Sequence, residues 1–252
     1  MIDLKGKSAL ITGSSKGIGL AIARALHQAG CHVLLNGRTE APLKQACDSL
    51  GAERCSYVVG DVSDPAEAQR IADAARALFG SLDILVCNVG SGASVPPGQE
   101  TAAEWQRVFA TNLWSTTNMV ESCRDLITRQ TGSILCISSI CGNETIPGAP
   151  VTYSTAKAAL NAFVKGIARP LGKDGIRINA IAPGNILFDG SVWQRKLDEN
   201  EEAVDQMLQK DVALARLGTP EEIANLTLWL TSDQATFATG QIWTLDGGQT
   251  RR

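Results

Sequence analysis

The chain has 252 residues, of which 44% are hydrophobic and 19% are charged, proportions that indicate a globular protein with a sizeable core rather than a disordered one. Its net charge is −3 and it has no long basic run, which argues against nucleic acid as the main partner. No apolar run approaches the ~20 residues of a membrane helix, and the first residues lack a signal-like apolar segment. We therefore expect a cytoplasmic protein with no membrane partner.

The seven cysteines give no sign of a metal site or a disulfide framework. None forms a C-x-x-C pair, and the two histidines lie far along the chain from the pair Cys136 and Cys141. Cys31, Cys87 and Cys136 fall in or beside apolar runs, which is typical of free buried thiols. We therefore expect no metal and a reducing compartment.

Taken in chain order, predicted strands and helices alternate almost from end to end. Short apolar runs predict seven strands, at 8–11, 32–35, 55–59, 83–87, 132–137, 176–181 and 241–245. Apolar residues at helical spacing predict helices at 18–29, 40–50, 65–79, 103–128, 153–171 and 220–230. Asp64 stands near the N-cap of the third of these helices.

This order of elements predicts the fold class. Strands that are short and apolar without clean alternation are typical of a parallel sheet that is covered on both faces. Right-handed crossovers then give an α/β, Rossmann-type doubly wound sheet of about seven parallel strands with helices on both faces. Because no repeat, low-complexity tract or linker divides the chain, we expect a single domain over residues 1–252.

One segment, 188–217, breaks the alternation. It mixes apolar residues such as Trp193 with many charged ones, which predicts one or two amphipathic helices. A solvated surface helix with one buried face is one interpretation. The other is a substrate lid, because the segment follows the C-terminal end of a strand, where such sheets bind ligands. In a lid, Trp193 and Arg195 would be available to an anionic or sugar-like substrate.

A glycine-rich turn, Thr12-Gly-Ser-Ser-Lys-Gly-Ile-Gly19, follows the first predicted strand and opens the first helix. Glycines let the backbone bend tightly and approach a bound group, and the helix N-terminus behind them presents free N–H groups to a phosphate. The spacing G-x-x-x-G-x-G differs from the common G-x-G-x-x-G fingerprint. A flexible loop is the alternative, but the strand-turn-helix context favours a dinucleotide pyrophosphate site.

Tyr153 and Lys157 stand four residues apart at the start of a predicted helix, so both side chains lie on one face. A phenol with a pKa of about 10 is a poor acid–base catalyst at neutral pH, and an adjacent ammonium lowers that pKa. The pair is a candidate proton donor to a carbonyl oxygen. An ordinary helix surface is the alternative, because Y-x-x-x-K alone is common.

Together, the turn and the pair make the chain resemble the short-chain dehydrogenase/reductase family, in its compact single-domain branch, over nearly all its length. The turn matches the family's T-G-x-x-x-G-x-G and the pair matches its Y-x-x-x-K. The resemblance implies no metal and a catalytic set of Asn112, Ser139, Tyr153 and Lys157. It implies a nicotinamide cofactor in contact with Gly13, Ser15, Lys16, Gly17, Ile18, Gly19, Arg38, Asp61, Val62, Asn88, Gly90, Tyr153, Lys157, Pro183, Gly184 and Ile186.

The mechanism that the resemblance implies is hydride transfer between the nicotinamide and a substrate carbonyl carbon. Tyr153 exchanges the proton, and Lys157 lowers the pKa of Tyr153 and holds the ribose of the nicotinamide. Ser139 hydrogen-bonds the substrate oxygen. Asn112 helps to hold a water that links Lys157 to solvent.

Two departures from the family pattern bear on these roles. Ser139 fits the family's S-x-x-G, although it stands fourteen rather than thirteen residues before Tyr153, and its neighbour Ser138 is expected to face the opposite side of the strand. Phe188 occupies the position of a threonine that often binds the nicotinamide carboxamide. Either the backbone N–H of Ile186 makes that contact, or the lid sits differently.

The end of the second strand favours NADP(H) over NAD(H). In NAD-dependent relatives an acidic residue there binds the ribose 2′-hydroxyl, whereas this chain has Gly37 followed by Arg38. A guanidinium binds a 2′-phosphate in a fork, and Lys16 adds a second positive charge. Two surface charges are the alternative, with Glu40 available to pair with Arg38. For Asp61 the alternative to an adenine contact is a helix-capping role.

The substrate is left open by the family motifs. Reduction of a 3-oxoacyl-type ketone is favoured, because the chain looks most like the 3-oxoacyl-acyl-carrier-protein reductase group. A sugar or polyol dehydrogenase is the alternative within the enzyme class, and a non-catalytic NADP-binding regulator is the alternative outside it. Because the family usually forms tetramers, we expect a homo-oligomer, with apolar residues such as Trp114 and Met119 compatible with an interface.

Overall fold

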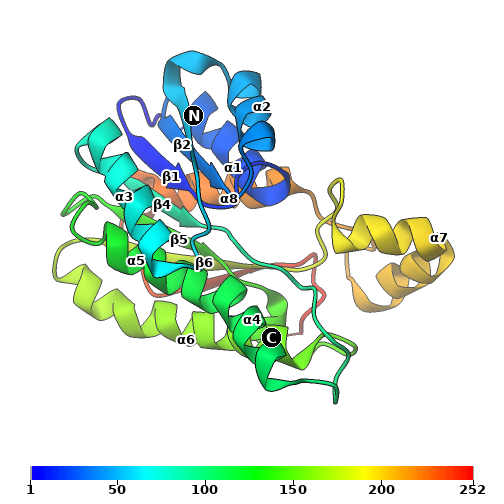
Figure 1. Cartoon of the computed structure of the whole chain (residues 1–252). Helices are drawn as coiled ribbons and strands as arrows, with labels where there is room; N and C mark the ends of the chain where they lie inside the picture. Colours follow the sequence, from blue (N-terminus) through cyan, green and yellow to red (C-terminus); the bar gives the residue numbers. More distant parts are fainter. Residues whose placement is uncertain (1, 252) are drawn as a thin grey trace.

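Seven short strands build one fully parallel sheet (Figure 1). The structure, a computed structural model, describes residues 2–251 and has the spatial strand order β3-β2-β1-β4-β5-β6-β7. The order reverses between β1 and β4, and this is the point at which doubly wound sheets bind their ligands. The strands are β1 (Ser8–Ile11), β2 (His32–Gly37), β3 (Cys55–Val59), β4 (Ile84–Cys87), β5 (Ser133–Ile137), β6 (Arg177–Pro183) and β7 (Ile242–Leu245).

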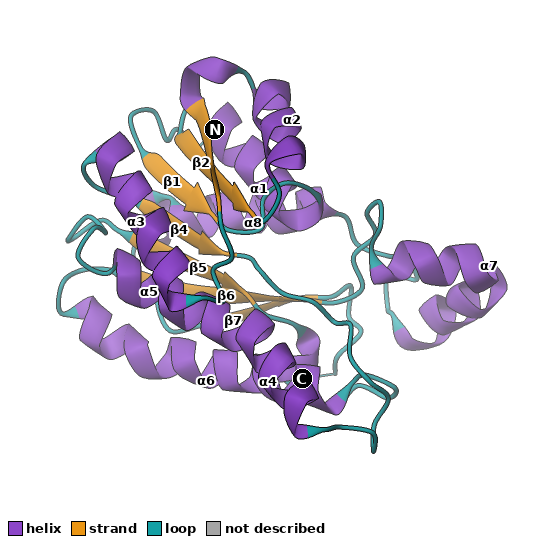
Figure 2. Ribbon diagram, viewed as in Figure 1, coloured by secondary structure: helices purple, strands orange, loops and turns teal. Residues whose placement is uncertain are grey.

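Helices cover both faces of the sheet, because successive strand residues point to opposite sides (Figure 2). Leu10 of β1 packs in a core with α3, α5 and α6, whereas Ile11 beside it packs in a second core with α1, α2 and α8. This confirms the predicted α/β doubly wound fold. The covering helices are α1 (Gly17–Gln28), α2 (Glu40–Leu50), α3 (Pro65–Phe79), α5 (Ser115–Cys123), α6 (Val151–Gly172) and α8 (Pro220–Thr231).

The long helix predicted over 103–128 is shorter and interrupted. The chain forms α4 (Ala102–Phe109), a π-helical turn over Ala110–Trp114, and then α5. After Cys123 the chain turns, and Ile127 forms a parallel bridge with Leu82. The apolar residues Leu126 and Ile127 are therefore buried beside the sheet without being part of a helix. The prediction of helix to residue 128 was wrong because a helical apolar pattern does not distinguish these two uses.

The segment 188–217 forms α7 (Val192–Asp211), which is bent at Asn200, where φ is −163° and ψ is 86°. It stands apart from the sheet (Figure 1), and its buried residues Val204 and Leu208 pack with Val212 in a small cluster separate from the two main cores. The predicted amphipathic segment is therefore confirmed as helical, with its own apolar centre.

The described cysteines are free thiols, and six of the seven are buried, including Cys31, Cys87 and Cys136, as expected. Among residues 2–251 no three His, Cys, Asp or Glu side chains are grouped so that they would hold a metal ion. None of the described helices is long and apolar enough to cross a membrane.

Candidate active site

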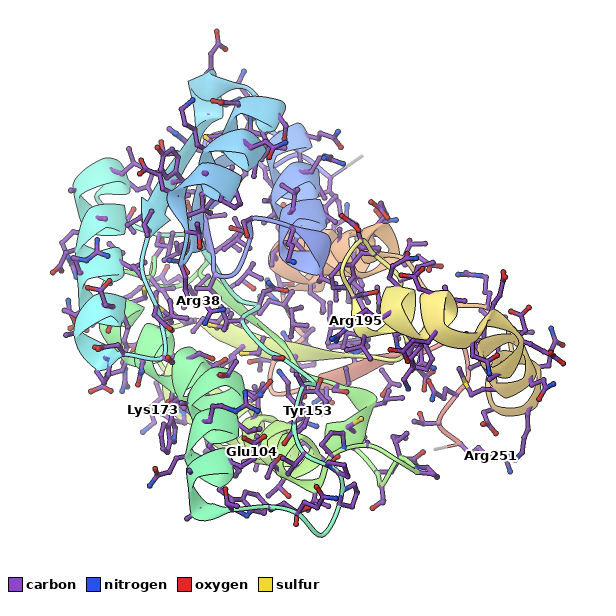
Figure 3. The ribbon with its side chains drawn as sticks, turned by 45° about the vertical axis from the view of Figure 1, so that its right-hand side comes forward. Arg38, Glu104, Tyr153, Lys173, Arg195 and Arg251 are labelled. Atoms are coloured by element: carbon purple, nitrogen blue, oxygen red, sulfur yellow. The ribbon has the colours of Figure 1, made fainter. Side chains whose placement is uncertain are left out.

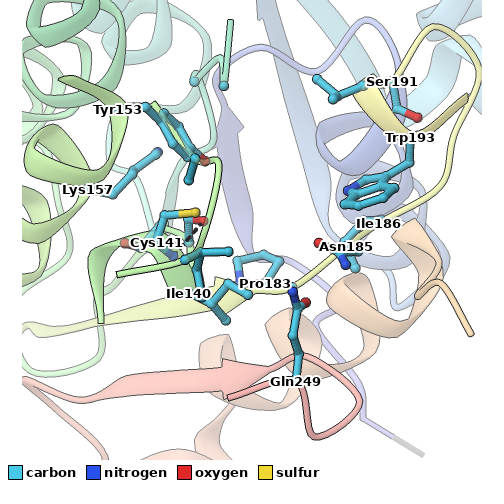
Figure 4. A pocket seen from close by; sticks show the side chains of 18 of the residues that line it. Ile140, Cys141, Tyr153, Lys157, Pro183, Asn185, Ile186, Ser191, Trp193 and Gln249 are labelled. Atoms are coloured by element: carbon cyan, nitrogen blue, oxygen red, sulfur yellow. Dashed lines mark hydrogen bonds between the residues drawn. The ribbon is translucent and has the colours of Figure 1, made fainter. Parts of the chain in front are cut away.

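A cavity of about 940 Å³ opens at the C-terminal edge of the sheet. Loops that follow β1, β4, β5 and β6 line it, together with the start of α6 and part of α7 (Figure 4). The carboxyl ends of parallel strands all meet at one edge, so this topology brings distant segments of the chain together. Twelve of the predicted site residues line the cavity: Gly13, Lys16, Ile18, Gly19, Asn88, Gly90, Ser139, Tyr153, Lys157, Pro183, Gly184 and Ile186.

The glycine turn is built to approach a bound group. Gly13 and Gly17 have φ values of 62° and 56°, a conformation that other residues rarely adopt, and a Cβ on Gly19 would overlap the carbonyl oxygen of Gly13. The Asn88 amide donates 3.0 Å hydrogen bonds to the carbonyls of Thr12 and Gly13 and so braces the turn from β4. The α1 N-terminus has no side-chain cap, which leaves it suited to an anion.

Phe188 occupies an unexpected place over this turn. Its ring lies so close to Gly17 that a Cβ there would come within 2.7 Å of it. Gly17 and Ser15 are absent from the cavity wall, whereas Phe188 is part of it. The aromatic side chain thus seats the start of the α7 segment directly on the glycine turn, a contact between positions far apart in the sequence.

Arg38, labelled in Figure 3, is exposed directly after the end of β2 and is not among the residues that line the cavity. Glu40, the alternative partner that the sequence offered, instead accepts a 3.1 Å hydrogen bond from the Tyr57 hydroxyl. No ion pair with Arg38 occurs among residues 2–251. The guanidinium is thus available for an anionic group beside Gly37.

Asp61 follows β3 and accepts hydrogen bonds from the backbone N–H and hydroxyl of Ser63. Burial acts in the opposite direction, but these bonds and the charge of Arg38 lower the pKa of Asp61. Asp64, as predicted, caps α3 with bonds from two backbone N–H groups, so the helix-capping alternative for Asp61 is wrong. The side chain of Val62 is buried in the core, 2% exposed.

Lys157 is almost completely buried, 2% exposed, and its ammonium donates a 2.8 Å hydrogen bond to the carbonyl oxygen of Ile137 at the end of β5. Burial lowers the pKa of Lys157 to about 8. The ammonium lies 5.9 Å from the centre of the Tyr153 ring, and a Cβ on Gly90 would stand 3.0 Å from it. A residue larger than glycine at position 90 would therefore press on the buried charge.

The predicted fall in the pKa of Tyr153 does not occur in this structure. Burial raises the pKa of the phenol to about 12, and a hydrogen bond with the Ser139 side chain opposes that rise only in part. Tyr153 thus carries its proton at neutral pH, which is the form that can protonate a carbonyl oxygen. The sequence argument weighed the ammonium of Lys157 but not the loss of water around the phenol.

Two adjacent serines at the end of β5 face different partners. Ser139 lines the cavity beside Tyr153 and accepts a bond from the Cys141 backbone N–H at 3.2 Å. Ser138 donates its hydroxyl to the Asn161 side chain at 2.6 Å, on the α6 side of the strand. Ser138 also borders the cavity, but its hydroxyl is engaged by Asn161, so the Ser139 hydroxyl is the better placed of the two to meet a substrate oxygen.

Asn112 lies in the π-helical turn and is 1% exposed. Its amide donates to the carbonyls of Ser91 and Val108, and its Oδ1 accepts from the Ser91 backbone N–H at 2.9 Å. A Cβ on Gly90 would stand 3.1 Å from this oxygen, so Asn112 and Lys157 flank Gly90 from two sides. Asn112 thus fixes the loop after β4 beside Lys157.

The α7 segment contributes Trp193, Lys196 and Met207 to the cavity wall. The Lys196 ammonium lies 4.4 Å from the centre of the Trp193 ring, a cation–π contact. Arg195, for which the sequence left a substrate contact and a surface position open, is exposed and absent from the wall, as a surface residue would be. Gln249, from the turn after β7, enters the cavity opposite (Figure 4).

Comparisons with known proteins agree with this geometry. A family model described as enoyl-(acyl carrier protein) reductase matches residues 13–250. The chain is 34% identical over 249 residues to 3-oxoacyl-(acyl-carrier-protein) reductase of Chlamydia muridarum, covering 97% of this chain and 98% of that protein. The chain belongs to the short-chain dehydrogenase/reductase family. It is thus an oxidoreductase.

Two further proteins that are similar to this chain are named for sugar substrates. Glucose 1-dehydrogenase 2 of Bacillus subtilis is 34% identical over 256 residues, covering 98% of this chain and 96% of that protein. L-sorbose reductase of Gluconobacter frateurii, solved in complex with NADPH and L-sorbose, matches the fold with a TM-score of 0.93. It shares 31% identity and covers 100% of this chain and 99% of that one.

Burial of Lys157 predicts a characteristic dependence of stability on pH. The pKa of Lys157 falls from 10.5 to about 8 on folding, so its buried charge destabilises the native state below pH 8, and this cost disappears as the pH rises toward 10.5. We expect the free energy of unfolding of the wild type, relative to that of Lys157→Met, to rise by up to about 3 kcal/mol across this window. Urea denaturation at several pH values measures it.

A matched control is Lys165→Met, since Lys165 is exposed on the same helix. Its unfolding free energy should follow that of the wild type in parallel over the same pH range. A constant difference between the wild type and Lys157→Met from pH 7 to 10 would contradict the lowered pKa.

Proposed function

We propose that this chain is an NADP-dependent oxidoreductase that reduces a ketone to a secondary alcohol, with a 3-oxoacyl-type ketone favoured. The observation that carries the proposal is that Tyr153, Ser139 and Lys157 lie together in the wall of the main cavity, with the Lys157 ammonium 5.9 Å from the centre of the Tyr153 ring. The glycine turn forms another part of the same wall, so a dinucleotide and a small substrate fit side by side.

The residues present fit a dinucleotide with a 2′-phosphate. The uncapped N-terminus of α1 and its glycines suit the pyrophosphate, while Gly184 and Ile186 form the wall expected to meet the nicotinamide. The exposed Arg38, free of Glu40, supplies a fork for the 2′-phosphate, and Lys16 adds a second charge. When bound, the nicotinamide supplies hydride to the carbonyl carbon.

Side chains of the protein supply the proton to the substrate oxygen and stabilise the negative charge that this transfer leaves on Tyr153. Ser139 holds the substrate oxygen, and Tyr153 donates its proton to that oxygen. Lys157, fixed by the carbonyl of Ile137, places a positive charge beside the phenol and limits the cost of the negative charge that forms on it. Asn112 secures the loop beside Lys157, in keeping with a water-mediated path for replacing the proton.

A sugar or polyol dehydrogenase and a non-catalytic NADP-binding regulator are the two alternatives to this function. A sugar or polyol substrate is favoured by the relatives named for glucose and L-sorbose and by polar groups in the wall such as Lys196 and Gln249. The 3-oxoacyl substrate is favoured by the first reported relative and by apolar wall residues such as Ile146 and Met207. A non-catalytic NADP-binding regulator is disfavoured, because it has no need of the Tyr153 and Lys157 arrangement.

We also propose a homo-oligomer, as the family usually forms one. Trp114 is 43% exposed and remains available for an interface, whereas Met119 is 0% exposed and belongs to the monomer's core. Packing in the monomer's core therefore explains the apolar character of Met119, and no subunit interface is needed to account for it.

Replacement of Tyr153 by Phe tests the proposed reaction. We expect Tyr153→Phe to lower kcat/KM for ketone reduction by about 10²- to 10⁴-fold, because the variant has no proton to donate. NADPH oxidation is followed by absorbance with an acetoacetyl thioester, a ketose and a simple ketone. NADPH binding, measured by fluorescence, should be retained. If the wild type binds NADPH but acts on no ketone or alcohol, the regulator replaces the enzyme as the best function.

Replacement of Arg38 tests the proposed cofactor. We expect Arg38→Ala to raise KM for NADPH by about 10- to 100-fold, the equivalent of one charge-assisted hydrogen bond, and to leave KM for NADH almost unchanged. Arg24→Ala is the control, since it removes one exposed arginine from α1. A wild type that prefers NADH would contradict the proposal.

A further inference from the structure

We propose that Glu104 is a positioning residue for Tyr153, acting through the hydroxyl groups of Ser94 and Thr152. The inference rests on the proposed role of Tyr153 as the proton donor. It concerns three residues that no sequence motif singled out, on α4, on the loop after β4 and at the start of α6. Figure 3 shows Glu104 and Tyr153 in the same region of the molecule.

The three side chains form a continuous hydrogen-bonded relay. Ser94 donates its hydroxyl to Glu104 Oε1 at 2.7 Å, and its oxygen lies 2.6 Å from the hydroxyl oxygen of Thr152. Because a serine hydroxyl carries one hydrogen and Ser94 gives it to the carboxylate, Thr152 must be the donor to Ser94. The Thr152 side chain is completely buried, so this bond fixes its orientation.

The carboxylate at the end of the relay is held firmly. Arg107 donates to both oxygens of Glu104, at 2.6 and 2.9 Å, and also to the carbonyl of Ala93 at 2.9 Å. The Arg107 hydrogen bond, followed by that of Ser94, lowers the pKa of Glu104 to about 2. Glu104 is therefore negatively charged at every pH at which the enzyme would be assayed.

The first turn of α6 has no side-chain cap to hold it in place. Pro150 precedes the helix, and its side chain cannot accept a bond from the N–H groups of that turn. Thr152 and Tyr153 are consecutive in this turn, so a shift of Thr152 displaces the phenol as well. The relay anchors the turn to α4 and brings a negative charge toward a helix N-terminus, where it is favourable.

A purely structural role would give a different result. Glu104 and Arg107 also hold the loop after β4 through Ala93, and that loop forms part of the cavity wall through Ser91 and Gly92. If Glu104 and Arg107 only hold this loop in place, their loss would change the binding of substrate or NADPH, and hence KM. Misplacement of the phenol changes kcat, because binding does not need the proton.

The sharpest test replaces Thr152 by Val and by Ser in the full-length enzyme, with NADPH and the best ketone of the panel. Thr152→Val keeps the shape but removes the hydroxyl, and we expect kcat to fall by about 10- to 100-fold with KM for NADPH within twofold of the wild type. Thr152→Ser keeps the hydroxyl and should restore most of kcat. Ser94→Ala should resemble Thr152→Val, and Ser94→Thr should resemble the wild type.

Glu104→Gln extends the test to the carboxylate. We expect a similar loss of kcat, equal at pH 6 and pH 9, because the carboxylate is ionised at both. Glu67→Gln is the matched control, since Glu67 pairs with Arg70 three residues on in α3, and Arg70 likewise donates to a backbone carbonyl. That variant should keep the kcat of the wild type.

The inference is overturned if Thr152→Val and Ser94→Ala keep kcat within twofold of the wild type, if their loss lies only in KM, or if Thr152→Ser and Ser94→Thr fail to rescue kcat. Tyr153→Phe in the same assay separates this inference from the proposed function. If Tyr153→Phe is fully active, the proposed proton donor is wrong. If it is inactive while Thr152→Val is normal, only the relay is wrong.

Discussion

One buried ammonium sets the constraints on the rest of the site. Lys157 gives up its hydration to donate to the carbonyl of Ile137, and a charge in that position is costly unless its surroundings are fixed. The end of β5 must stop where this carbonyl is free, α6 must pack within reach of it, and position 90 must have no side chain. Stability is given up here for a charge beside the phenol, which is common at functional sites.

The sequence was sufficient to predict the fold and many of the residues that line the main cavity. Each glycine of the turn, and the pair Tyr153 and Lys157, is recognised from local spacing, because a strand-turn-helix unit and one helix face place them without reference to distant residues. The strands were located in the same way, although β2 and β6 continue two residues past their predicted ends, to Gly37 and Pro183. These features converge in space because the topology gathers every strand end at one edge.

What the sequence could not predict depends on contacts between distant segments. The Tyr57 hydroxyl of β3 donates a hydrogen bond to Glu40 at the start of α2, and the Phe188 ring covers Gly17. The residues next to them in the sequence indicate neither contact. The raised pKa of Tyr153 reflects burial by several elements together. The π-helical turn at Asn112 adds one residue to a helical turn, and the helical apolar pattern does not distinguish that addition from an ordinary helix.

The separate apolar cluster of α7 has a consequence for how such an enzyme changes during evolution. Because Val204, Leu208 and Val212 cluster with other apolar residues of the segment 188–217, substitutions on the cavity side of α7 disturb few contacts of the two main cores. If α7 covers the substrate as proposed, new substrate preferences arise by mutation in this one segment, while the packing of the two main cores changes little. Such an arrangement lets selection act on specificity and on stability as two nearly independent traits.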